Sequence, residues 1–105
     1  MDVTTLTLDQ VRILSSTAED HFQDRKSARI APAKLTKTMS AFANADGGEL
    51  LVGIEDDGTW AGLAEIEGFN GHLQAMEPLF PYGSEFKYEF FQHPSEQTYV
   101  LVSCA

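Results

Sequence analysis

Residues 39–58 constrain the fold of this chain more than any other stretch, because a helix end, a glycine turn and a buried strand follow one another within it. Leu35, Met39 and Phe42 are spaced at i, i+4 and i+7, which places them on one face of a helix. The positions between them are mostly polar or basic. This spacing predicts a helix over residues 33–45.

The pair Gly47 and Gly48 predicts the end of that helix, because glycine readily adopts the left-handed conformation common at helix C-termini. The apolar run that follows is too short for an independent buried helix and predicts a strand over residues 49–55. Asp57 and Gly58 form a dipeptide that favours a tight hairpin turn. We expect a short return arm after the turn, at residues 60–63.

The remaining elements are predicted from spacing and alternation. Thr7 and Gln10 have the spacing of a capping box, which predicts a short N-terminal helix over residues 7–14. Apolar residues at helical spacing predict a second long helix over residues 65–77. Alternating or β-rich segments predict strands at 20–25, 85–91 and 98–102. The elements together predict an α+β sandwich, in which two main helices cover a mixed sheet.

Three blocks of sequence occur in an order that is typical of one family. They are residues 19–27 (Glu-Asp-His-Phe-Gln-Asp-Arg-Lys-Ser), the glycine-turn stretch 40–58, and residues 60–63 (Trp-Ala-Gly-Leu). Together they closely resemble the signature of the Schlafen AlbA-2 domain family. The resemblance implies a DNA-binding module with an Alba-like two-layer fold.

Length predicts one domain over residues 1–105. The resembled family usually continues past the last strand into further strands. Two alternatives therefore stay open: the chain is a module of a longer protein with an additional C-terminal domain, or a partner chain completes its sheet edge, giving a homo-oligomer.

Charge is distributed unevenly along the chain. The net charge of −9 argues against a simple nucleic-acid-binding surface. However, residues 25–37 hold five cations and no acid, whereas residues 46–67 hold seven acids and no Lys or Arg. A local basic patch would attract phosphates despite the acidic total. The predicted phosphate-binding residues are Arg25, Lys26, Arg29, Lys34 and Lys37; the alternative is that they form only a solvated face.

The resemblance also implies a candidate catalytic set. Family members that cut RNA use two acids on the early strand and one after the glycine-turn strand, with a divalent metal. The matching positions here are Glu19, Asp24 and Asp56, which would hold Mg²⁺ or Mn²⁺. Asp24 is one methylene shorter than the glutamate of the nuclease members. The alternative is structural: exposed strand acids, with Asp24 paired to a lysine and Asp56 shaping the turn.

Other features of the sequence argue against several classes of protein. No apolar run approaches the ~20 residues needed to cross a bilayer, so no membrane partner is expected. A lone cysteine, Cys104, cannot form an internal disulfide and indicates a cytoplasmic protein. His21, His72 and His93 are scattered, so we interpret them as surface or half-buried residues without a metal.

The favoured function is nucleic-acid binding, DNA or RNA, without a cofactor, in a transcriptional regulator or a defence-related protein. A metal-dependent endoribonuclease is the first alternative. A protein-interaction or oligomerisation module is the second.

Overall fold

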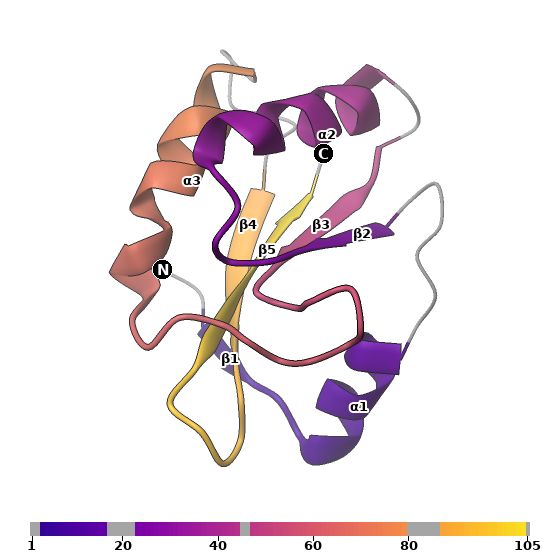
Figure 1. Ribbon diagram of the computed structural model, residues 1–105, viewed down its shortest axis with the longest axis vertical. Helices are drawn as coiled ribbons and strands as arrows, with labels where there is room; N and C mark the ends of the chain where they lie inside the picture. The colour runs from indigo at the N-terminus through magenta and orange to yellow at the C-terminus, as the bar shows by residue number, and fades with distance from the viewer. Residues whose placement is uncertain (1–2, 17–22, 45–46, 80–86, 105) are drawn as a thin grey trace.

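The computed structural model describes residues 3–16, 23–44, 47–79 and 87–104 (Figure 1). Within these ranges the elements are β1 (Val3–Thr5), α1 (Leu8–Ser16), β2 (Gln23–Lys26), α2 (Pro32–Asn44), β3 (Glu49–Val52), the 3₁₀ helix η1 (Ile66–Phe69), α3 (Asn70–Met76), the 3₁₀ helix η2 (Glu77–Leu79), β4 (Lys87–Gln92) and β5 (Tyr99–Cys104). None of the described helices is long and apolar enough to cross a bilayer.

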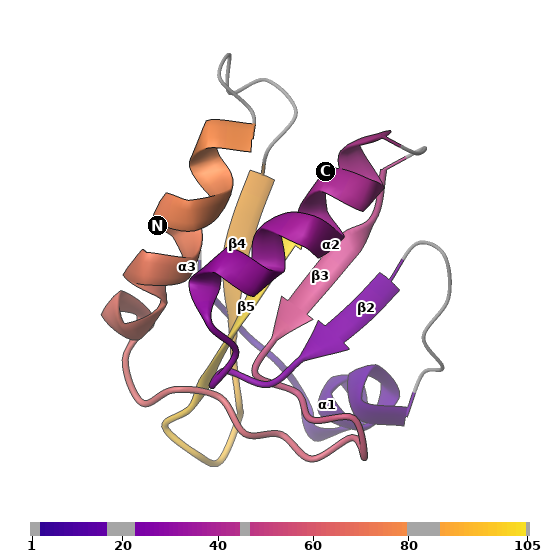
Figure 2. The ribbon, with the colours of Figure 1, turned by 45° about the horizontal axis from the view of Figure 1, so that its top comes forward.

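The strands form one mixed sheet in the order β1-β4-β5-β3-β2. The two outer pairs, β1 with β4 and β2 with β3, are parallel, whereas β5 pairs antiparallel with both of its neighbours. Helices α2 and α3 lie over one face of this sheet, and α1 lies on the other side (Figure 1 and Figure 2). The predicted α+β sandwich is confirmed, as are the positions of its four expected strands; residues 20–22 and 85–86 of those predictions lie outside the described residues.

The main core lies between the sheet and the helices α2 and α3. Strand side chains that point towards α2 and α3 alternate with those that point away, as the pleat requires. The buried residues of this cluster are Ala28, Leu35, Met39, Phe42, Leu50, Val52, Phe69, Leu73, Met76, Phe90 and Leu101. The helical spacing of Leu35, Met39 and Phe42 thus marks the buried face of α2, as the sequence predicts.

A second, smaller cluster lies on the opposite face of the sheet. Leu51, Ile54, Val100 and Val102 are buried there, and Leu14 at the end of α1 packs against them. Both faces of β3 are therefore covered, which explains its uninterrupted apolar run.

The glycine turn after α2 has the geometry that the sequence predicts. Gly47 has φ of +94°, and its N–H donates to the carbonyl of Phe42 at 3.1 Å, a bond typical of a helix C-terminus. Gly48 lies so close to the Phe42 ring that a Cβ would overlap it. The strand that follows is shorter than predicted: β3 ends at Val52, because Gly53 has φ of +122° and leaves the extended conformation.

The predicted helix over 65–77 is present but only partly α-helical. It begins with η1, in which the Gly68 N–H bonds to the Glu65 carbonyl in the i→i−3 pattern of a 3₁₀ helix. Regular α-helix starts only at Asn70. Gly68 and Gly71 lower the helix propensity of this segment, which fits its tightened first turn.

The predicted return arm does not form a regular strand. Trp60 makes one isolated bridge with Ile54, whereas Leu63 bridges Tyr99 of β5. The segment therefore leaves β3 soon after the turn and crosses to the neighbouring strand.

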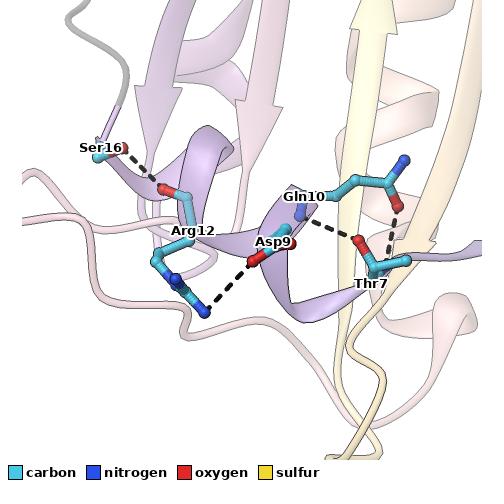
Figure 3. A network of polar contacts seen from close by, with 5 residues as sticks. All are labelled: Thr7, Asp9, Gln10, Arg12 and Ser16. Atoms are coloured by element: carbon cyan, nitrogen blue, oxygen red, sulfur yellow. Dashed lines mark hydrogen bonds and ion pairs between the residues drawn. The ribbon is translucent and has the colours of Figure 1, made fainter.

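The N-terminal helix begins with the predicted capping box (Figure 3). The N–H of Thr7 donates to Oε1 of Gln10 at 2.8 Å, and the N–H of Gln10 donates to Oγ1 of Thr7 at 3.1 Å.

Strand β1, which precedes α1, was not expected from the sequence. Its three residues are all exposed, so no alternation of burial marks them in the sequence.

The close contact at Gly48 leads to a stability prediction. Gly48→Ala should lower the free energy of unfolding by about 1–3 kcal/mol, because the new methyl must displace the buried Phe42 ring. The matched control is Gly71→Ala in α3, where the Cβ would lie 3.7 Å from Pro32. This change should stabilise the protein by up to about 1 kcal/mol through helix propensity. Urea unfolding would measure the stability of both variants. Equal changes in the free energy of unfolding would contradict the proposed clash with the Phe42 ring.

Candidate nucleic-acid interface

Four cations lie along one continuous segment that runs from the end of β2 into α2. Lys26 is the last residue of the edge strand β2, and Arg29 is exposed in the turn that follows. Lys34 and Lys37 are exposed on α2, one helical turn apart. We call Lys26, Arg29, Lys34 and Lys37 the basic surface. The part of the sequence with most Lys and Arg is thus largely exposed.

Lys26 is partly neutralised within the chain. Its Nζ lies 3.0 Å from Oδ2 of Asp24, and the two side chains are 34% and 20% exposed. Residues two apart on a strand share a face, which brings this pair together. The structure therefore shows the lysine partner that the structural interpretation of Asp24 expects. An anion at Lys26 would compete with this carboxylate.

Arg25 is used inside the fold. It is only 7% exposed, and its Nη1 donates to the carbonyls of Leu14 at 3.2 Å and Ser15 at 3.1 Å. These carbonyls belong to the last turn of α1, which has no basic residue of its own. Strand alternation directs Arg25 towards α1 and away from its neighbour Lys26. Arg25, which the sequence places among the phosphate-binding residues, is therefore buried against α1 and is not part of the basic surface.

The turn between β2 and α2 is held by side-chain hydrogen bonds. The hydroxyl of Ser27 donates to Oε1 of Glu55 at 3.0 Å and accepts the backbone N–H of Arg29 at 3.2 Å. The N–H of Ile30 donates to the Ser27 carbonyl at 3.1 Å. Glu55 thus contacts the turn from the segment after β3. The turn that carries Arg29 is therefore an ordered structure.

His72 contacts the same turn from α3. Its Nε2 lies 3.0 Å from the Ile30 carbonyl, and the residue is only 7% exposed. Its ring also packs against Phe69, with the ring centroids 5.9 Å apart. The sequence interpretation of His72 as a surface or half-buried residue is wrong. Only its helical spacing with Phe69 could have indicated an inward position.

The start of α2 adds to the positive field. Its first turn contains Lys34 and no acid, although carboxylates are the side chains that this end of a helix favours. The positive end of the helix dipole and Lys34 therefore reinforce each other. A negatively charged group approaching this end would be stabilised by both.

The opposite face of the sheet carries two acids and a lysine, Lys87, around Cys104. Glu49 and Glu89 lie there, in register with or beside Cys104 of β5. Burial raises the pKa of the Cys104 thiol, and these two carboxylates raise it further. Glu49 and Glu89 thus lie on the other side of the sheet from the basic surface, whose own side includes Asp24.

Of the three acids of the catalytic hypothesis, Asp24 pairs with Lys26, and Glu19 lies outside the described residues. Asp56 is exposed in the turn after β3. Its neighbour Asp57 stabilises that turn by accepting the Thr59 N–H at 2.9 Å. Hydrogen bonding from the Thr59 side chain, and secondly from its backbone N–H, lowers the pKa of Asp57. Within the described ranges, no group of three His, Cys, Asp or Glu is placed to hold a metal ion. Metal-dependent cleavage with Mg²⁺ or Mn²⁺ stays a prediction.

The architecture defines an α+β sandwich with a five-stranded mixed sheet and a basic segment along its edge strand and α2. The family model described as "Schlafen, AlbA_2" matches residues 19–103. The chain therefore belongs to the Schlafen AlbA_2 family, and the resemblance seen in the sequence is confirmed. No curated protein matches the chain. Elements β1 and α1 precede the matched range, although both belong to this fold.

The different positions of Arg25 and Arg29 can be tested with one substitution at each. Arg25→Met should lower the free energy of unfolding by about 1–3 kcal/mol, because two carbonyls of α1 lose their donor. Arg29→Met is the control and should change stability little, because the side chain is exposed. Urea unfolding measures both. An Arg25→Met protein as stable as the wild type would show that this bond does not hold α1.

Proposed function

We propose that this chain binds nucleic acid through the basic surface formed by Lys26, Arg29, Lys34 and Lys37. The observation that carries the proposal is the arrangement of these cations along β2, its turn and the first two turns of α2. Sequence residues 25–45 contain no acid. Membership of the Schlafen AlbA_2 family supports the same function.

The proposed contacts are with the phosphate backbone. Lysine and arginine side chains neutralise phosphates and release condensed counterions, which gives affinity without reading the bases. The start of α2 offers its dipole to the same phosphates. The net charge of −9 opposes the approach of a polyanion at long range. Binding by this chain should therefore be weak and strongly dependent on salt, and a second subunit or domain would strengthen it.

The cellular role that we propose draws support from the family and from the lone cysteine. We place the protein in the cytoplasm, where a lone cysteine such as Cys104 stays reduced. Its binding activity would serve a transcriptional regulator or a defence-related protein.

Reversing the charge of α2 should test the interface. The double variant Lys34→Glu/Lys37→Glu should weaken binding about ten- to a hundredfold at low salt, because two phosphate contacts are replaced by repulsion. The slope of log affinity against log salt concentration should fall by about two. Fluorescence anisotropy with duplex and single-stranded DNA and RNA would measure both quantities.

The matched control uses the two cations outside residues 25–37. Arg12→Glu/Lys87→Glu changes the net charge from −9 to −13, as the α2 variant does, but leaves the basic surface intact. Arg12 is highly exposed, and its guanidinium pairs with Asp9 on its own helix (Figure 3). Equal loss of affinity in both variants would mean that total charge, and not this surface, controls binding. Absence of binding by the wild type at low salt would refute the proposal.

A further inference from the structure

His72 is a polar residue on the buried face of α3. Its neighbours on that face, Phe69, Leu73 and Met76, are apolar and belong to the main core. An apolar side chain of similar size would fill this position without the cost of removing an imidazole from water. The histidine therefore needs an explanation beyond packing.

The hydrogen bond to Ile30 supplies that explanation. A carbonyl can only accept, so Nε2 of His72 carries the proton and donates it to the Ile30 oxygen at 3.0 Å. Nδ1 is also buried and has no partner among the described residues. Burial therefore gives Nδ1 no compensating hydrogen bond within the described residues. The hydrogen bond from Nε2 to Ile30 is the specific contact that the ring makes with the turn.

The bond between His72 and Ile30 fixes the conformation of the turn between β2 and α2. Ala28 is buried and Ile30 packs against the main core, whereas Arg29 between them is exposed. Glu55 holds the beginning of the turn through Ser27, and His72 holds its end. Arg29 is therefore directed outward by a turn that is fixed from two sides.

The same contact lies beside the start of α2. Helix α2 begins two residues after Ile30, at Pro32. A Cβ at Gly71, the residue before His72, would lie 3.7 Å from Cγ of Pro32. The beginnings of α3 and α2 thus lie against each other, and His72 joins them through the turn.

We propose that His72 is a positioning residue of the nucleic-acid interface: it contacts no phosphate itself, but its bond to Ile30 holds the turn from which Arg29 reaches the backbone. This inference rests on the proposed function. It assigns the support of the basic surface to a residue of α3, 35 positions after Lys37 in sequence. The assignment predicts that the effect of His72 on binding passes through Arg29.

Three substitutions at His72 separate its hydrogen bond from its packing. His72→Gln keeps an N–H donor near the position of Nε2, whereas His72→Leu keeps the volume and removes the donor. His72→Asn stays polar but is too short to reach the Ile30 carbonyl, and it serves if the leucine variant does not fold. Circular dichroism and urea unfolding would show which variants are folded under the binding conditions.

Binding to a fluorescent DNA duplex at low and moderate salt gives the decisive readout. We expect His72→Leu and His72→Asn to weaken binding about three- to tenfold and to lower the salt slope by about one, as if one phosphate contact were lost. His72→Gln should restore both values. In an Arg29→Gln background, removing the His72 donor should have little further effect, because the two residues act in series.

Failure of the proposed function and failure of the role of His72 would give different results. If the wild type does not bind, the proposed function fails, and the role of His72 fails with it. If the wild type binds but the folded donor-free variants keep its affinity and salt slope, only the role of His72 is refuted. A loss of affinity that is equally large in the Arg29→Gln background would also refute it, since His72 would then act through general stability.

Discussion

The fold depends on the burial of β3 from both sides. Leu50 and Val52 point into the core under α2 and α3, whereas Leu51 between them points into the smaller cluster near α1. This strand also pairs parallel with β2 on one edge and antiparallel with β5 on the other. Its four residues therefore connect both layers and both halves of the sheet. A polar residue at any of these three positions would be buried without water.

Strand β2 shows how one short segment can serve two purposes. Asp24 and Lys26 lie on the side of the sheet that faces α2, where they pair with each other. Arg25 lies on the other side and binds the last carbonyls of α1. Consecutive cations in the sequence thus have separate roles: one stabilises a helix end, and the next remains at the edge of the proposed interface. The pleat alone produces this division.

The sequence predicted the elements whose signals are local. The spacing of α2, the glycine turn, the capping box and the alternation of β4 and β5 each depend on neighbouring residues. Contacts between segments that are distant in the sequence could not be predicted from such local patterns. Strand alternation places Arg25 and Lys26 on opposite sides of the sheet, but only the position of α1 shows which of them is buried. His72 and Ile30 are 42 residues apart, and no motif joins them.

Strand β1 also sets the order in which the molecule can assemble. It is the first described element in the chain, yet its partner is β4, and Thr5 contacts Gln92 across 87 positions of sequence. On the ribosome, Val3–Thr5 emerges before β4 and cannot form this pairing until β4 has been synthesised. Parallel pairing over such a separation is slow to form because a long loop must first close. The outer edge of the sheet is therefore completed only after β4 has been synthesised.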